Sequence, residues 1–262
     1  MPRPANGPKS APPEPRALAG EIAFEEGDLH ALSEPLAGDA QYDDRRLVLR
    51  RKLLTLGKAF CARPAPKELG LEPRSSLHNP TVFNGMRVRR IWSYVTRGKK
   101  EKSRLRRTLG PDLAKDLDAA FRNAYLCLAV ESEAVEVSFR IHADAWYDGQ
   151  NMKRRVEAEG ARALLEVLNE LGGFRARIAD WKGEWPLGEL GIEGLEELLG
   201  YYVPGERALA IERRWPAPAS APDARRALFA PQVPETLLDE LERLVPLYRW
   251  AAWSQESDHL FG

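Results

Sequence analysis

The stretch AYLCLAVESEAVEVSFRIHADAW, residues 124–146, decides the fold class. Residues 124–130 are apolar on both faces, which is typical of a central strand in a sheet. After a short polar turn at residues 131–133, polar and apolar residues alternate as far as residue 142. The inward-facing set is Val135, Val137, Phe139 and Ile141, and the outward-facing set is Glu136, Ser138, Arg140 and His142. A period of two indicates a strand with one buried face, so the stretch predicts an antiparallel hairpin over residues 124–142.

The segments that follow the hairpin alternate between helical and extended patterns. An amphipathic helix is predicted over residues 151–173, where apolar residues recur every three or four positions. Strands are predicted near residues 174–181 and 207–214, with a short helix over residues 193–202 between them. Together with the hairpin, these strands predict an α+β fold, an antiparallel β-sheet covered by helices on one face.

The segments before the hairpin are mostly helical in pattern. We expect a short edge strand over residues 21–32, a helix over residues 41–63 and another helix over residues 112–123. Residues 87–107 also favour a helix, interrupted at Gly98, because four apolar residues fall at i, i+3, i+4 and i+7. These four residues are Val88, Ile91, Trp92 and Val95.

Composition divides the chain into four parts. Residues 1–19 are rich in proline and poor in bulky apolar residues, and we expect a disordered leader there. Residues 20–214 are expected to form the α+β core domain. A linker rich in Pro and Ala is predicted over residues 215–231, followed over residues 232–262 by a C-terminal helix that packs on the core.

The overall composition favours a cytoplasmic protein. The apolar fraction of 44% supports a buried core, and no apolar run approaches the roughly 18 residues that a membrane span needs. The N-terminus lacks the apolar segment of a secretory signal. Cys61 and Cys127 form no CxxC pair, so we expect both thiols to be reduced. The abundance of Arg and Ala is typical of a GC-rich, and we expect bacterial, coding source.

A strongly basic stretch suggests a function. Residues 87–107 hold ten basic side chains and one acidic side chain, although the 39 basic and 39 acidic residues of the whole chain balance. Arg makes bidentate contacts with phosphates and Lys adds positive charge. The leading hypothesis is therefore a polyanion- or nucleic-acid-binding protein in which these cations face outward. The residues expected to bind are Arg87, Arg89, Arg90, Arg97, Lys99, Lys100, Lys102, Arg104, Arg106 and Arg107.

The basic stretch has other interpretations. Acidic residues follow it within residues 112–133 and could neutralise it, because a run of charge is usually a solvated face. Alternatively, the basic helix docks an acidic partner, and the chain is a protein-interaction scaffold. Its outer face lacks the bulky apolar residues of a membrane-surface helix, so no membrane partner is expected.

A further alternative is a metal-dependent hydrolase or nuclease. Its candidate residues are Glu136, His142, Asp144 and Asp148, with His142 as the base and the carboxylates as metal-binding or orienting groups. The simpler interpretation is that these are the polar residues that the solvent side of an antiparallel strand must carry. The sequence contains no Walker phosphate loop, HExxH, paired CxxC or GxSxG motif, and we expect no cofactor and no metal centre.

Overall fold

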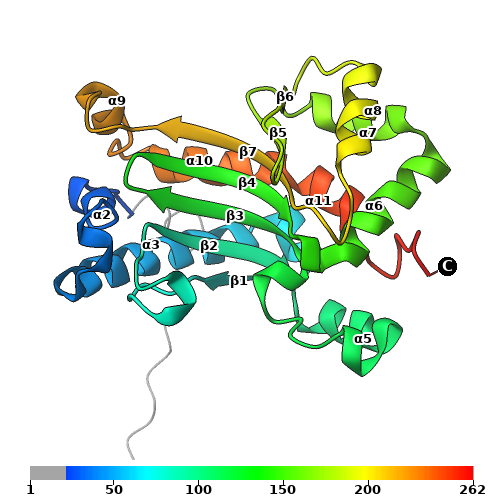
Figure 1. The fold of residues 1–262 in the computed structure, drawn as a ribbon, viewed down its shortest axis with the longest axis horizontal. Coiled ribbons are helices and arrows are strands. Elements are labelled where there is room, and N and C mark those ends of the chain that lie inside the picture. Colours follow the sequence, from blue (N-terminus) through cyan, green and yellow to red (C-terminus); the bar gives the residue numbers. More distant parts are fainter. Residues whose placement is uncertain (1–21, 262) are drawn as a thin grey trace, which may run out of the picture.

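A seven-stranded antiparallel β-sheet forms the centre of the structure (Figure 1). This computed structural model describes residues 22–261, so the leader predicted over residues 1–19 lies outside the described residues. The order across the sheet is β1-β2-β3-β4-β7-β5-β6. The strands are β1 (Leu71–Ser75), β2 (Arg90–Arg97), β3 (Ala124–Glu131), β4 (Ala134–Ile141), β5 (Arg175–Ile178), β6 (Glu184–Pro186) and β7 (Leu209–Pro216).

The predicted hairpin is confirmed as β3 and β4. Their register pairs Leu126 with Phe139 and Leu128 with Val137, and all four side chains are buried. The strands predicted near residues 174–181 and 207–214 are confirmed as β5 and β7. The α+β fold class is therefore confirmed.

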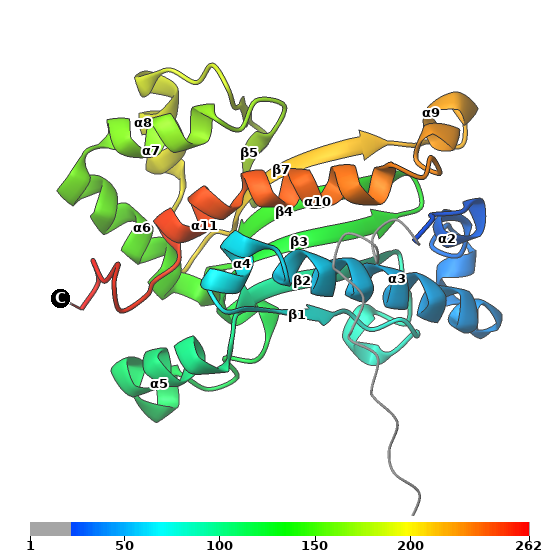
Figure 2. The ribbon, with the colours of Figure 1, turned by 180° about the vertical axis from the view of Figure 1, so that it is seen from behind.

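Three helices cover one face of the sheet. They are α3 (Asp43–Cys61), α10 (Val233–Arg243) and α11 (Val245–Ala251), which lie in front of the strands in Figure 2 and behind them in Figure 1. α3 packs on β1 and β2, whereas α10 and α11 pack on β3 and β4. A new helix begins at Val245, with Pro246 in its first turn, so the predicted C-terminal helix is two helices. Within residues 22–261, no helix combines the length and apolar character of a membrane span.

Most of the remaining α-helices lie at the ends of the sheet (Figure 1), whereas α4 (Pro64–Glu68) lies between α3 and α11 (Figure 2). The helix predicted over residues 151–173 is two helices, because Gly160 separates them with φ +89°. The short helix predicted over residues 193–202 is confirmed as α8. These helices are α2 (Glu26–His30), α4 (Pro64–Glu68), α5 (Lys99–Leu113), α6 (Trp146–Glu159), α7 (Ala161–Asn169), α8 (Ile192–Tyr201) and α9 (Pro222–Ala227).

The helix predicted for the first part of the basic stretch is wrong, because residues 90–97 form β2. Ile91 and Val95 are buried on the side of α3, and Trp92 and Tyr94 alternate with them on the other face. Val88, Ile91, Trp92 and Val95 fit one side of a helix, whereas a strand places Ile91 and Trp92 on opposite faces. Pairing with β3 decides between them, since it places Arg90 opposite Glu131. The second helical piece is confirmed as α5.

Two other predictions about the first half are also wrong. Residues 26–30 form helix α2 where an edge strand was expected. Residues 112 and 113 are the end of α5, and residues 114–123 contain turns and a single 3-10 turn at Ala120–Arg122, because Gly110, with φ +80°, ends the regular part of α5. Strands β1 and β6 were not predicted, and α9 lies within the segment expected to be a linker.

Candidate functional site: the open face of the sheet

The helices leave one face of the central strands uncovered. Within residues 22–261, no helix lies across the front of β2, β3, β4 and β7 in Figure 1. We call this surface the open face. Its side chains are Arg90, Trp92, Tyr94, Tyr125, Cys127, Glu131, Glu136, Ser138, Arg140, Arg175, Arg177, Glu212 and Arg214.

Strand alternation brings these side chains together. The polar set of β4, which includes Glu136 and Ser138, points away from the helices that cover the apolar set. The register of β4 with β7 places Arg214 beside Glu136 and Glu212 beside Ser138. The open face therefore collects opposite charges from strands that are distant in the sequence.

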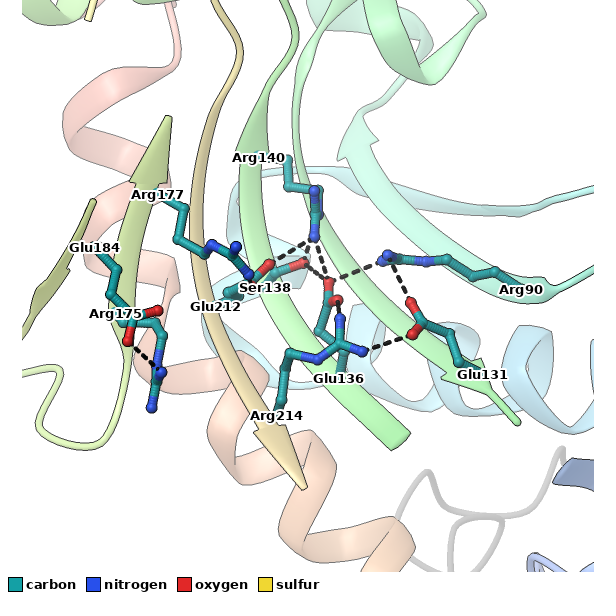
Figure 3. A network of polar contacts seen from close by, with 10 residues as sticks. All are labelled: Arg90, Glu131, Glu136, Ser138, Arg140, Arg175, Arg177, Glu184, Glu212 and Arg214. Atoms are coloured by element: carbon teal, nitrogen blue, oxygen red, sulfur yellow. Dashed lines mark hydrogen bonds and ion pairs between the residues drawn. The ribbon is translucent and has the colours of Figure 1, made fainter. Parts of the chain in front are cut away.

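Glu136 is the centre of this network (Figure 3). Its side chain is 1% exposed and accepts hydrogen bonds from three guanidinium groups. Arg90 Nη2 and Arg140 Nη2 donate to Oε1, each at 2.8 Å, and Arg214 Nη1 donates to Oε2 at 2.9 Å. The hydroxyl of Ser138 donates to Oε1 at 2.7 Å. A single buried carboxylate thus holds three arginines on the open face.

Two further glutamates extend the network to both sides. Glu131 Oε2 accepts from Arg214 Nη2 at 2.6 Å, and its Oε1 accepts from Arg90 Nη1 at 3.2 Å. On the other side, Glu212 accepts from Arg140 at 2.8 Å and from Arg177 at 3.2 Å. The network therefore spans five strands, from β2 to β5 (Figure 3).

The electrostatics of Glu136 exclude it as a general base at neutral pH. Burial by itself would raise the pKa of this carboxyl, but Arg140 and Arg90 outweigh burial and lower the pKa to about 2. The same contacts raise the pKa of Arg140 and Arg90 against the opposing effect of burial. Glu136 therefore stays ionised and organises the arginines around it.

The network carries a small surplus of positive charge. Four arginines, which we call the arginine cluster, face three glutamates. Each guanidinium carries five N–H donors, and the hydrogen bonds to the glutamates use only some of them. The cluster is Arg90, Arg140, Arg177 and Arg214, with side chains between 25% and 51% exposed.

Two adjoining cavities lie over the arginine cluster. One, of about 370 Å³, extends between Arg140 and Arg177 towards Trp181. The other, of about 220 Å³, lies between Arg90 and Trp92. Both include Tyr125 and Arg140 in their walls, so together they form one depression across the open face.

Aromatic side chains form one border of this depression. Tyr94 and Tyr125 meet edge to face, with ring centroids 6.0 Å apart, and Trp92 is the next open-face residue of β2. Burial raises the pKa of Tyr125 to about 12, so its hydroxyl stays protonated and neutral. The site thus combines guanidinium donors with flat apolar surfaces.

The four residues predicted for a hydrolase lie in different environments. His142 and Asp144 are about half exposed and lie 3.4 Å apart between Nδ1 and Oδ2. Asp148 is buried and pairs with Arg97, whereas Glu136 belongs to the network described above. Among residues 22–261, no group of three His, Cys, Asp or Glu side chains could hold a metal ion. The described residues therefore contain no metal site that the predicted hydrolase could use.

The structure likewise places the ten cations of the basic stretch in several different environments. Arg87 and Arg89 pair with Glu34, and Arg90 joins the arginine cluster. Arg97 and Lys102 are buried and do not face outward, because Asp148 and Asp118 pair with them. Arg104 pairs with Glu101 at 2.7 Å. Four exposed cations, all on α5, have no ion pair among the described residues: Lys99, Lys100, Arg106 and Arg107.

Sequence reasoning found half of the network and missed the rest. Glu136, Arg140 and Arg90 were singled out, but Arg177, Glu212 and Arg214 were not. The signal was clear in FRARIADW, where exposed arginines alternate with buried residues, but RALAIERRW carries three consecutive charged residues, of which Glu212 is buried. The missing information was the order of the strands, which places β7 between β4 and β5.

Comparison of the chain with protein-family models and with curated proteins found no match.

Proposed function

We propose that the protein is a binding protein whose open face recognises an acidic segment of a partner protein. The observation that supports this proposal is the arginine cluster, whose partly exposed guanidinium groups are fixed by the buried carboxylates of Glu136 and Glu212. Fixed guanidinium groups lose little side-chain entropy when they bind a carboxylate in a bidentate manner.

We also propose a cytoplasmic location, which the free state of Cys61 and Cys127 supports.

The composition of the open face favours a protein partner over a nucleic acid. Arg, Trp and Tyr contribute most of the affinity at protein interfaces, and all three border the depression. A phosphate backbone presents a uniform row of negative charges, which the interleaved Glu131 and Glu212 would repel. A protein segment, in contrast, can place a carboxylate against the arginines and an apolar side chain against the aromatic residues of the open face.

An exposed apolar loop in the β1–β2 connection supports the same proposal. Phe83 is 94% exposed, and Val82 and Met86 are also exposed. The loop is nevertheless ordered by hydrogen bonds, since the Thr81 amide donates to Asn84 Oδ1 at 2.8 Å. A fixed, exposed aromatic side chain is typical of a residue that is covered when a partner binds.

Two arginines of β5 provide a matched test of this proposal. Arg177 and Arg175 are 51% and 52% exposed, and each pairs with one glutamate, but only Arg177 borders the depression. Peptides selected from a random display library on the wild-type protein are expected to be rich in Asp or Glu beside apolar residues. Arg177→Glu should weaken the selected peptides about tenfold, because a favourable charge pair becomes repulsive. Calorimetric titration measures the affinities.

Arg175→Glu is the control and should leave the affinity of the same peptides nearly unchanged. Trp92→Ala should weaken them as well, because it removes one border of the depression. If Arg175→Glu and Arg177→Glu have equal effects, or if the library yields no acidic peptides, the depression on the open face is not the binding site.

Nucleic-acid binding is the second candidate function, and α5 supports it. Lys99 and Arg106, and likewise Lys100 and Arg107, are seven residues apart and therefore share a side of the helix. All four are exposed and have no ion pair among residues 22–261. They form a compact group of free cations within the predicted basic stretch.

The salt dependence of DNA binding tests this second candidate. Replacing Lys99, Lys100, Arg106 and Arg107 with glutamine should reduce the slope of log K against log salt by about 3.6, at about 0.9 for each lost phosphate contact. The double variant Arg87→Gln/Arg89→Gln is the control, because Glu34 pairs with both of these arginines. Fluorescence anisotropy with a duplex oligonucleotide measures both slopes. Unchanged affinity in the quadruple variant rules out this surface.

A further inference from the structure

A row of three aromatic rings runs from the core to the depression on the open face. Trp185 of β6 is 6% exposed, and its Nε1 donates to Glu197 Oε2 at 2.9 Å. The next ring is Tyr201, the last residue of α8, whose centroid lies 6.2 Å from that of Trp185. Trp181, in the turn between β5 and β6, is the outermost ring, and its centroid lies 3.8 Å from that of Tyr201. Three segments at one end of the sheet (Figure 1) therefore hold the outermost ring in place.

The outermost ring of this row is fixed but not covered. The amide of Trp181 closes the turn by donating to the Ile178 carbonyl at 3.2 Å. Asp180 has φ +63°, a left-handed conformation that is costly for a residue other than glycine and that recurs at functional sites. A Cβ at Gly183 would lie 2.5 Å from Trp181 Nε1, so the turn fits closely around the indole. Although Tyr201 stacks on one face, Trp181 is 38% exposed and belongs to the wall of the cavity of about 370 Å³.

The same cavity contains guanidinium groups of the open face. Arg140, Arg177 and Arg214 belong to its wall, and the buried Glu212 holds the first two in position. The cavity therefore presents hydrogen-bond donors from β4, β5 and β7 and a flat indole from the turn after β5. Aromatic pairs are more favourable than their buried area alone predicts, so an aromatic ring suits Trp181 better than an aliphatic side chain. A ligand that uses both features carries an anionic group and a flat ring.

A peptide fits the remaining polar group of the cavity better than a nucleic acid, although nucleotides also combine a ring with an anion. The exposed carboxylate of Asp180 belongs to the cavity wall and has no ion pair among the described residues. The N–H groups of a peptide backbone can donate to this carboxylate, whereas a phosphodiester backbone has no N–H donor and is repelled by it. The wall therefore favours a peptide that has both an acidic and an aromatic side chain.

We propose that the acidic segment bound by the open face carries an aromatic residue next to its acidic residue. The aromatic ring stacks on Trp181, and the carboxylate binds Arg177. The inference rests on the proposed function and names the chemical class of the segment that is bound. Trp181 is then the residue that sets the preference for an aromatic over an aliphatic neighbour.

Peptide selection tests this proposal separately from the proposed function. Acidic peptides selected from a random display library on the wild-type protein are expected to carry Phe, Tyr or Trp within two residues of the Asp or Glu. Selection on Trp181→Leu should return acidic peptides without this enrichment. Acidic peptides with only aliphatic neighbours on the wild type would overturn this proposal and leave the proposed function standing. A library that returns no acidic peptides would overturn both.

A double-mutant cycle measures the contact between the peptide ring and Trp181. Each selected peptide is compared with an analogue in which leucine replaces its aromatic residue. Trp181→Leu should weaken the aromatic peptide about threefold to tenfold more than the analogue, because only the aromatic peptide loses a ring–ring contact. Arg177→Glu should weaken the two peptides equally, by about tenfold each. Calorimetric titration measures the affinities, and equal losses of both peptides with Trp181→Leu would overturn the proposal.

Trp215→Leu is the matched control for this cycle. Trp215 is also partly buried, but it packs against the core and lies opposite Val135, on the face of the sheet that the helices cover. Both peptides should bind this variant as they bind the wild type. A loss equal to that of Trp181→Leu would show a general effect of replacing tryptophan and would overturn the proposal.

Fluorine NMR of the full chain labelled with 5-fluorotryptophan reports the stacking directly. The Trp181 resonance, identified by its absence from the spectrum of Trp181→Phe, should shift when the aromatic peptide saturates the protein. The leucine analogue should shift this resonance less, since it brings no ring current. No shift at saturation, or displacement of the peptide by an equal concentration of a single-stranded oligothymidylate, would overturn the proposal.

Discussion

Glu136→Gln is expected to lower the free energy of unfolding by about 3–5 kcal/mol at pH 7, as is typical when one partner of a buried ion pair is removed. The side chain of Glu136 is 1% exposed and forms ion pairs with Arg90, Arg140 and Arg214. A neutral amide of the same shape leaves three guanidinium groups close to one another without this compensation. Denaturation in urea, followed by circular dichroism, measures the loss.

The loss of stability should depend on pH in a defined direction. The pKa of Glu136 falls from 4.5 to about 2 in the folded protein, so the unfolded chain takes up this proton first as the pH falls. The ionised carboxylate therefore contributes its full stabilisation above about pH 4.5 and loses it as the pH falls towards 2. This difference in pKa corresponds to about 3 kcal/mol. The difference in the free energy of unfolding between wild type and Glu136→Gln should therefore shrink by about 3 kcal/mol between pH 4.5 and pH 2.

Glu131→Gln provides the control for this experiment. Glu131 also contacts two arginines of the cluster, but its side chain is 28% exposed, so solvent screens its charge. Its replacement should cost less than about 1 kcal/mol at pH 7. Equal losses for Glu131→Gln and Glu136→Gln, or a gap for Glu136→Gln that does not change between pH 7 and 2, would contradict the central role of Glu136.

Asp148→Ala is expected to destabilise the protein by about 3–5 kcal/mol, because it leaves the buried charge of Arg97 without a partner. The backbone amides of Ala124 and Trp253 also lose their acceptor. Since Trp253 belongs to the C-terminal segment, limited proteolysis should cut this segment faster in the variant. Urea denaturation and mass spectrometry of the fragments measure the two effects.

A double variant separates charge from hydrogen bonding at this position. Arg97→Met/Asp148→Ala removes both charges, so it should be more stable than Asp148→Ala alone, although the two amides still lack an acceptor. Asp144→Ala, which changes an exposed carboxylate four residues away, should stay within about 0.5 kcal/mol of the wild type. If the double variant is less stable than Asp148→Ala, the Arg97–Asp148 pair is not coupled in the way the structure indicates.

Local sequence patterns were sufficient for much of the fold. The hairpin was predictable because β3 is apolar on both faces and the apolar positions of β4 repeat every two residues, a pattern that a helix cannot bury. β2 was not predictable in the same way. Val88, Ile91 and Val95 are all buried, and their spacing satisfies a helix, while the alternation is broken by the charge of Arg90. That charge is accommodated only because Glu131 and Glu136 come from other strands.

The candidate sites were predictable only where their partners are close in sequence. Glu136 and Arg140 are four residues apart on one strand, and the alternation placed both on its outward-facing side, where they pair. Arg214 is 78 residues from Glu136, and Arg97 is 51 residues from Asp148. Such pairs depend on the strand order and on the packing of the C-terminal segment, about which a local pattern of residues carries no information. For the same reason, the sequence could not show that Arg97 and Lys102 are buried, since their partners Asp148 and Asp118 lie 51 and 16 residues away.

The position of β7 between β4 and β5 has a consequence for biosynthesis. β4 ends at Ile141 and β7 begins at Leu209, so the ribosome must make the whole of residues 142–208 before β4 gains its second neighbour. At about 5–20 residues per second, the nascent sheet exposes an unsatisfied hydrogen-bonding edge for several seconds. During that interval the free edge of β4 can pair with a strand of another nascent chain. A ribosome-associated chaperone that covers β4 would prevent this pairing.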